Sequence, residues 1–324
     1  MRAISVAGLN KPVSVIGLGT MIFHPNSQER DFGLLDTFAG CGGTYIDTAE
    51  VYGAVEGHGF SEMVIGEWLS ARPGVRENIV LSSKGLIPGF CEALYPGGAK
   101  IDPPSIHKAI DGSLKRLKTD YLDIWMFHRD EPSHAVGPLV DALDEEVRSG
   151  RIKAYGASNW TTRRLQEAID YALGNQKAEM MSSSENFSLA RANEPFWPDT
   201  VFVTEDDRAW YKSNDLPLIA WSALGRGFFA KGDPNDRSDA DLVRTFYSDD
   251  NFKRKQRAME FAVAKGLSMF EVALGYVINQ DFPVVALNGA GTSEHVANSA
   301  RASDLHLTSA ERDWLDLSSE ERPF

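Results

Sequence analysis

Cysteines and long apolar runs are the most conspicuous absences from this sequence. Only two cysteines, Cys41 and Cys91, occur among 324 residues, too few for a disulfide framework or a CxxC metal site. No apolar run approaches the roughly 20 residues that a membrane span needs. Asn10, Lys11 and Pro12 fall where a signal peptide would be apolar. We therefore expect a cytoplasmic protein without a membrane partner.

Positive charge is also scarce. The chain has 33 lysines and arginines against 46 aspartates and glutamates, a net charge of −13. Affinity for nucleic acids comes from clustered Lys and Arg side chains, so we expect no nucleic-acid partner. The seven histidines show no HxxxH spacing, and we expect no metal site.

Hydrophobic patterning predicts strands and helices that alternate along the whole chain. The expected strands are Val13–Gly19, Thr44–Asp47, Ile79–Lys84, Leu122–His128, Ile152–Ser158, Ala178–Ser184, Leu216–Ser222 and Phe282–Leu287. Helices are expected between them, near Gln28–Gly40, Ser61–Ala71, Pro103–Leu117, His134–Ser149 and Thr161–Leu173, and around the last strands. Since no linker rich in Pro, Gly or Ser interrupts this order, we expect residues 1–324 to form a single domain.

Eight such βα units fit either a closed barrel or an open, doubly wound sheet. Several expected strands are continuously apolar, which suits a parallel sheet buried on both faces. The open arrangement normally carries GxGxxG after its first strand, and this motif is absent. We therefore predict an α/β fold of the (β/α)8 TIM-barrel type. Ser268–Glu271 and Thr308–Glu311 have the spacing of helix capping boxes.

Two connections are longer than a simple link requires. Gly85–Ile101 follows the third expected strand, and residues from Ala223 to about Asn251 follow the seventh. In a (β/α)8 barrel, the loops that follow strands emerge on the C-terminal face, where active sites lie. We expect these long loops after strands 3 and 7 at the C-terminal face to form lids or substrate pockets. Plain surface insertions are the alternative.

Four polar residues lie at or just after the ends of expected strands. Asp47, Lys84 and His128 each end a strand, and Tyr52 follows Asp47 by five residues. Because parallel strands bring their C-terminal ends to one face, we expect these side chains to form one acid–base centre. Each of them alone has an ordinary structural explanation, such as packing in the core. Their joint placement on three successive strands favours catalysis.

The chemistry expected of this centre is proton transfer to or from the oxygen of a carbonyl–alcohol pair. A free tyrosine has a pKa of about 10, and we expect the ammonium of Lys84 to lower the pKa of Tyr52. Asp47 would keep Lys84 charged and oriented. His128 would hydrogen-bond the carbonyl oxygen and aim it at Tyr52. Proton transfer alone leaves the oxidation state unchanged, so a redox reaction would require a hydride carrier.

The motifs around these residues resemble those of the aldo-keto reductase family. They follow the family's order and are Ile46–Gly53, Ser82–Lys84, His128, Gly150–Asn159, Trp221–Gly227 and Asn288–Ala290. The resemblance implies a (β/α)8 barrel that reduces carbonyls, or oxidises alcohols, with a nicotinamide dinucleotide. It also implies that Tyr52 is the general acid/base, with Lys84, Asp47 and His128 in the supporting roles given above.

The resemblance further implies a cofactor site that spans several strand ends. The matching residues are Gly19, Thr20, Met21, Asp47, Ser158, Asn159, Ser184, Trp221, Ser222, Leu224, Gly225, Arg226, Gly289, Gly291, Thr292 and His295. In the family, the first three lie near the nicotinamide ribose, Ser158 and Asn159 match carboxamide ligands, and Trp221 stacks on the nicotinamide. The segment after Trp221 matches the pyrophosphate loop, and the last turn precedes a helix whose start can bind phosphate.

Two departures from the family pattern affect this site. Ser184 stands where the family often has a glutamine. Gly291 and His295 stand near the turn where members that prefer NADP place Lys or Arg for the 2′-phosphate. NADP is the cofactor expected from the family, and NAD or use of both stays open.

The expected substrate is a small aldehyde, ketone or sugar-like carbonyl or alcohol. Arg129, Asp130 and Glu131 follow His128 and suit a hydroxylated substrate such as a carbohydrate. The alternative is that they are ordinary charged surface residues, which are common after a strand. Two other functions are alternatives: a redox-sensing regulatory subunit that binds cofactor with little turnover, and a barrel lyase with Lys84 as Schiff-base amine. The sequence leaves both a monomer and a homo-oligomer open.

Overall fold

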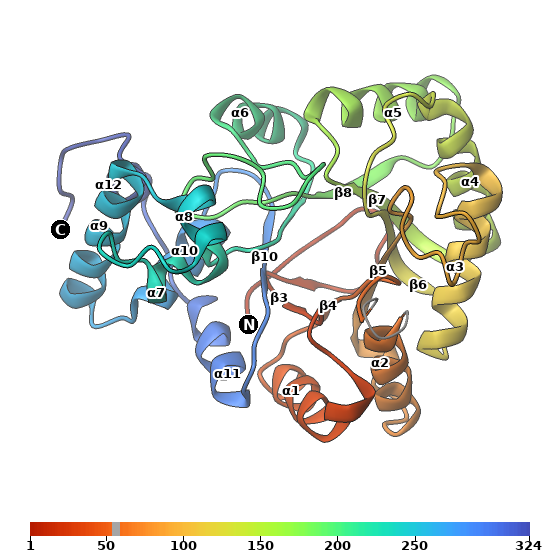
Figure 1. The fold of residues 1–324 in the computed structure, drawn as a ribbon, viewed down its shortest axis with the longest axis horizontal. Coiled ribbons are helices and arrows are strands. Elements are labelled where there is room, and N and C mark those ends of the chain that lie inside the picture. Colours follow the sequence, from red (N-terminus) through yellow and green to blue (C-terminus); the bar gives the residue numbers. More distant parts are fainter. Residues whose placement is uncertain (54–58) are drawn as a thin grey trace.

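The computed structural model describes residues 1–53 and 59–324, and a closed barrel of parallel strands lies at its centre (Figure 1). Each strand pairs with its neighbour in the chain, and the last one pairs with the first. The eight barrel strands are β3 (Ile16–Gly19), β4 (Tyr45–Asp47), β5 (Val80–Gly85), β6 (Leu122–Phe127), β7 (Ile152–Ser158), β8 (Met180–Ser184), β9 (Leu218–Ala220) and β10 (Val284–Asn288). This architecture confirms the predicted (β/α)8 barrel.

Helices surround the barrel (Figure 1). They are α1 (Gln28–Gly40), α2 (Phe60–Ser70), α3 (Pro103–Leu117), α4 (Val136–Ser149), α5 (Thr162–Gly174), α6 (Glu205–Asn214), α7 (Phe228–Lys231), α8 (Ala240–Phe246), α9 (Asp249–Lys265), α10 (Met269–Ile278), α11 (Ser293–Ala302) and α12 (Ser309–Leu315). Three short 3₁₀ turns add Pro25–Ser27, Arg76–Asn78 and Gly225–Gly227. In the described residues no single helix could cross a membrane, and only α9 and α10 together, bent by 105°, have the necessary length and composition.

Local boundary signals in the sequence are confirmed. Ser268 and Thr308 cap α10 and α12, and each forms a capping box with the glutamate three residues later. Most strand boundaries shift by one or two residues from those expected. The expected strand Val13–Gly19 is wrong as a single element: β2 (Val13–Ser14) pairs with β1 (Ala3–Ile4) in a separate antiparallel sheet.

The small β1–β2 sheet lies at the end of the barrel opposite the strand ends that carry the polar residues. Ser14 receives a hydrogen bond from the backbone N–H of Thr44, the residue before β4, at 3.0 Å. Val13 packs with the inward-facing Tyr45, Val80 and other apolar side chains of the barrel interior. The barrel is therefore filled and closed at its N-terminal end, which leaves the C-terminal mouth for a site.

Three long connections leave the C-terminal ends of the strands. Residues 86–102 separate β5 from α3, as expected. The connection after β9 is not a plain loop, because it contains the 3₁₀ turn at Gly225–Gly227, α7 and α8. The third, residues 185–204 between β8 and α6, was not expected, although Pro195 and Pro198 within it are a signal for a loop.

Candidate active site

A buried ion pair lies at the C-terminal ends of β4 and β5. Lys84 Nζ donates hydrogen bonds to both carboxylate oxygens of Asp47, at 2.5 and 2.6 Å, and to the backbone oxygen of Thr48 at 3.1 Å. Asp47 and Lys84 are only 1% and 3% exposed. Burial raises the pKa of Asp47, while Lys84 opposes this shift. Burial lowers the pKa of Lys84, but Asp47 and Tyr52 outweigh it and raise the pKa. Lys84 is therefore held as an ammonium, as the sequence suggested.

Tyr52 lies beside this pair. Lys84 Nζ is 5.5 Å from the centre of the Tyr52 ring. Burial raises the pKa of Tyr52, Lys84 lowers it and Asp47 raises it, and the net direction is upward. Lys84 lowers the pKa of Tyr52, as expected. The net rise was not expected from the sequence, and it arises because desolvation of the phenolate exceeds the attraction of the ammonium. Tyr52 is therefore a neutral phenol near neutral pH, which is the form that donates a proton.

His128, the residue after β6, also lies beside Tyr52. The two rings are 5.9 Å apart and nearly perpendicular, at 81°. Burial lowers the pKa of His128 well below its usual value, and the charges of Lys84 and Arg129 act in the same direction. Its Nδ1 atom is buried without a hydrogen-bond partner among the described residues. The structure thus brings the four predicted catalytic residues together, with His128 as a neutral imidazole.

The ends of β7 and β8 carry a network of hydrogen bonds. The Ser158 hydroxyl donates to the backbone oxygen of Ser184 at 2.7 Å, and Ser184 donates to that of Ile219 at 2.9 Å. Asn159, at a positive φ of 61°, donates its side-chain amide to the backbone oxygen of His128 at 3.1 Å. Ser158, Asn159 and Ser184 lie at the mouth, where the resemblance puts them, but their side chains are engaged within the protein.

Glu185 holds this network in place and was not expected from the sequence. Its carboxylate accepts the backbone N–H of Asn159 at 2.7 Å. Burial raises the pKa of Glu185 well above its ordinary value, and the hydrogen bond from Asn159 opposes this shift. An acidic residue at the end of the serine-rich strand Ser182–Ser184 is the only sequence signal for it.

The end of β3 contributes three of the residues expected near a cofactor. Thr20 is buried, and its hydroxyl donates to the backbone oxygen of Asp47 at 2.8 Å. Thr20 therefore fixes the position of Asp47 from the neighbouring strand. Gly19 is half-buried, and Met21 is 45% exposed at the rim of the mouth.

An aromatic group covers the end of β9. Trp221, half-buried, packs against Trp197 of the β8–α6 connection with ring centres 5.7 Å apart. The indole N–H of Trp221 is buried without a partner in residues 1–53 and 59–324. The guanidinium of Arg226 lies over Trp197, 4.8 Å from its ring centre. Trp197 was not expected from the sequence, because it comes from a different connection.

The segment after Trp221 and the turn after β10 border this group. Ser222, Gly225 and Arg226 all have positive φ values, of 53°, 57° and 54°, so the chain turns tightly there, with Leu224 half-buried between them. After β10, Gly289 and Gly291 each have open space where a Cβ atom would lie. Thr292 caps the ten-residue helix α11 by accepting the backbone N–H of His295, which is exposed.

The ends of β9, β10 and β3 are neighbours in the barrel, so these segments form one continuous strip. It offers an aromatic face, a tight turn, uncovered glycines and the N–H groups at the start of α11. This set of groups suits a dinucleotide, with the ring against Trp221 and phosphate at the helix start. A lysine or arginine at the final turn is missing, as noted from the sequence, and Glu294 is acidic.

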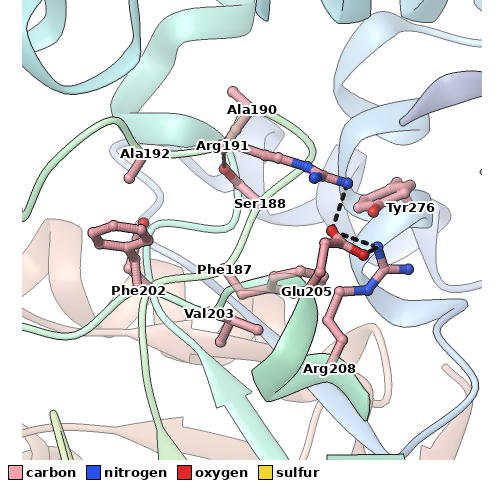
Figure 2. Close-up of a pocket in the computed structure, with 11 residues that line it drawn as sticks. Phe187, Ser188, Ala190, Arg191, Ala192, Phe202, Val203, Glu205, Arg208 and Tyr276 are labelled. Carbon is pink, nitrogen blue, oxygen red and sulfur yellow. Dashed lines mark hydrogen bonds and ion pairs between the residues drawn. The ribbon is translucent and has the colours of Figure 1, made fainter. Parts of the chain in front are cut away.

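Two other features of the structure are weaker candidates for a functional site. Figure 2 shows a cavity of about 10 Å³, room for roughly one water, between the β8–α6 connection and Tyr276. Glu205 bridges Arg191 and Arg208 there at 2.6 and 3.1 Å, which points to a structural role. Burial raises the pKa of the Cys91 thiol to about 12, so Cys91 is a poor nucleophile.

The fold and the site together define a parallel (β/α)8 barrel. Tyr, Lys, Asp and His side chains lie together at its C-terminal mouth, next to the strip formed by the segments after β9, β10 and β3. The profile described as "Aldo/keto reductase family" matches residues 15–318. The chain therefore belongs to the aldo/keto reductase family.

Characterised relatives and solved structures are similar over almost the whole chain. "Protein tas" of Escherichia coli is 28% identical over 91% of each chain. The "6-dehydroglucose reductase" of Novosphingobium aromaticivorans is 29% identical, over 83% of this chain and 78% of its own. A crystal structure of an aldo-keto reductase from Klebsiella pneumoniae in complex with NADPH is 26% identical, with a TM-score of 0.73, and the match covers 100% of this chain and 98% of that one.

Proposed function

We propose that this protein is an NADP(H)-dependent oxidoreductase that interconverts a carbonyl group and an alcohol, with Tyr52 as general acid/base. The observation that carries this proposal is that Tyr52 lies beside both the Asp47–Lys84 ion pair and His128. A nicotinamide cofactor supplies or accepts the hydride when it is bound. The protein's own residues hold the substrate oxygen and move its proton.

In the reduction direction, the substrate oxygen gains a proton as its carbon gains a hydride. The neutral phenol of Tyr52 donates that proton, since burial raises its pKa. Lys84, held as an ammonium by Asp47, then stabilises the phenolate that remains. His128 is uncharged, so its ring N–H donates a neutral hydrogen bond that orients the carbonyl oxygen toward Tyr52. In the oxidation direction the same phenolate accepts the proton.

Two observations support NADP(H) and a carbonyl substrate. The solved relative from Klebsiella pneumoniae is described as a complex with NADPH, and the residues that would hold the cofactor here are those of the strip from Trp221 to Thr292. The relative from Novosphingobium aromaticivorans is named for reduction of a sugar-derived carbonyl. We propose an aldehyde, ketone or sugar-like substrate on this basis.

The substitution Tyr52→Phe tests the proposal directly. It removes the phenolic O–H and keeps the ring, so we expect a loss of turnover of about 100- to 10,000-fold, while NADPH still binds with an unchanged Kd. NADPH oxidation with a panel of aldehydes and sugars measures turnover, and fluorescence titration measures binding. Undiminished turnover in the variant would reject Tyr52 as the proton donor. Tight cofactor binding by the unmodified protein without turnover on any carbonyl would favour a regulatory subunit instead.

A further inference from the structure

Arg129 is a half-buried cation with few partners at the mouth of the barrel. It follows His128 at the end of β6, and its guanidinium donates one hydrogen bond, to the backbone oxygen of His128, at 2.9 Å. A guanidinium has five N–H donors. Within residues 1–53 and 59–324, no carboxylate lies within ion-pair distance of Arg129. The side chain is therefore positioned but not neutralised.

The acidic groups near Arg129 are committed elsewhere. Asp130, the next residue, pairs with Arg164 at 3.3 Å. Glu185 accepts the backbone N–H of Asn159 at 2.7 Å, and burial raises the pKa of its carboxyl group well above the ordinary value. Asp199 is exposed and interacts with Arg129 only over a longer distance. None of the three lies within ion-pair distance of the guanidinium of Arg129.

The charge of Arg129 acts on the catalytic centre. Its guanidinium is hydrogen-bonded to the backbone oxygen of His128, and its charge lowers the pKa of both Tyr52 and His128. Burial lowers the pKa of Arg129 itself, which reflects the partial loss of water around an unpaired cation. Such a cation in a chain of net charge −13 indicates a site for an anion.

We propose that Arg129 binds an anionic group of the substrate, a carboxylate or a phosphate, beside the carbonyl that faces Tyr52. This inference rests on the proposed function and narrows its substrate class to aldehydes or ketones that carry such a group. Guanidinium binds both anions through paired N–H donors. The free N–H groups of Arg129 would take this role.

Matched pairs of substrates test the inference. The carboxylate pair is succinic semialdehyde and butanal, and the phosphate pair is D-glyceraldehyde 3-phosphate and D-glyceraldehyde. We expect the unmodified enzyme to favour the charged member of at least one pair by about 10- to 100-fold in kcat/KM, as for a charged hydrogen bond. Arg129→Gln should remove this preference and Arg129→Lys restore part of it. Arg163→Gln, at a side chain that is 89% exposed, is the control and should keep it.

The outcomes separate the two proposals. Reduction of butanal and D-glyceraldehyde without a preference for either charged partner overturns the role of Arg129 and leaves the proposed function intact. The proposal requires that Arg129→Gln does not lower the affinity for NADPH by the same factor as kcat/KM. An equal loss in both would assign Arg129 to the cofactor and would also overturn its proposed role in substrate binding. If no substrate is turned over, the proposed function fails. Calorimetric titration of the NADP⁺ complex with succinate and with inorganic phosphate then still decides whether Arg129 binds an anion. If Arg129→Gln binds either anion at least about tenfold more weakly than the unmodified protein does, the result supports the site. If the two proteins bind each anion with equal affinity, the site is rejected.

Discussion

The ion pair of Lys84 and Asp47 allows a prediction that joins stability and pH. Both side chains are at most 4% exposed, and Nζ contacts both carboxylate oxygens. Removing one partner of a buried pair leaves the other charge uncompensated, and this lowers the free energy of unfolding by about 3–5 kcal/mol. We expect Lys84→Met and Asp47→Asn each to destabilise the protein by roughly this amount at pH 7. The double variant carries neither charge. Its loss of stability should therefore be smaller, by at least about 3 kcal/mol, than the sum of the losses in the two single variants.

The two single variants should respond to pH in opposite directions. In Lys84→Met, burial raises the pKa of Asp47 without opposition. The folded state then keeps a proton that the unfolded state loses above about pH 3.9. Stability relative to the double variant therefore falls with rising pH, by up to about 1.4 kcal/mol per unit, until the pH passes the folded-state pKa.

In Asp47→Asn the sign reverses. Burial lowers the pKa of Lys84 once Asp47 no longer raises it. The folded state then lacks a proton that the unfolded state binds up to about pH 10.4. Stability relative to the double variant therefore rises with pH by up to about 1.4 kcal/mol per unit, from the lowered folded-state pKa upward.

Urea unfolding from pH 5 to pH 9, followed by tryptophan fluorescence, measures these slopes. The double variant is the reference at each pH, because it removes the contributions of all other titrating groups. Slopes of the same sign in both single variants, or none in either, would show that desolvation does not control the pair. Strict additivity of the two single losses would show that the two charges do not stabilise each other.

Two further predictions concern glycines. Gly291→Arg should raise the preference for NADPH over NADH by about tenfold, because open space surrounds the position of its Cβ and a guanidinium there could reach the 2′-phosphate; paired titrations with both cofactors measure this, and an equal effect on both would contradict it. Gly66→Ala should destabilise the protein by about 1–3 kcal/mol although alanine favours helices, because its Cβ would lie 2.3 Å from the backbone oxygen of Arg116. Gly33→Ala in α1, where the nearest atom is 4.0 Å away, is the matched control and should leave the urea midpoint equal or higher; similar midpoints for the two variants would refute the steric argument.

Much of the fold follows from local signals. The sequence signals are properties of short segments: apolar runs that alternate with helical periodicity, the absence of GxGxxG, and the caps at Ser268 and Thr308. The structure confirms the closed barrel and the two capping boxes that were predicted from them. The strand at Val13–Gly19 failed as one element because the chain bends at Val15, directly after Ser14. The Ser14 hydroxyl donates to the backbone oxygen of Ile16 and ties two short strands together. Nothing in the local apolar pattern distinguishes that bend from a continuous strand.

The candidate site was predictable to the extent that it depends on strand ends. Asp47, Lys84 and His128 occupy the ends of successive strands, so a closed parallel barrel necessarily brings them near one another. Trp197 and Glu185 were missed, because their roles depend on which connection folds over which strand. The net pKa shift of Tyr52 was also missed, since it depends on the burial of the whole mouth and not on Lys84 alone.

The sequence by itself therefore determined the type of fold, the four groups of the acid–base centre and the strand ends that carry them. Periodicity and residue order are encoded locally, and parallel closure turns order along the chain into proximity. Only the tertiary structure decided which of those groups are charged and which charges are paired. Desolvation and ion pairing depend on every segment around a side chain. They keep Lys84 charged and Tyr52 and His128 neutral, and within residues 1–53 and 59–324 they leave Arg129 at the mouth without a carboxylate at ion-pair distance.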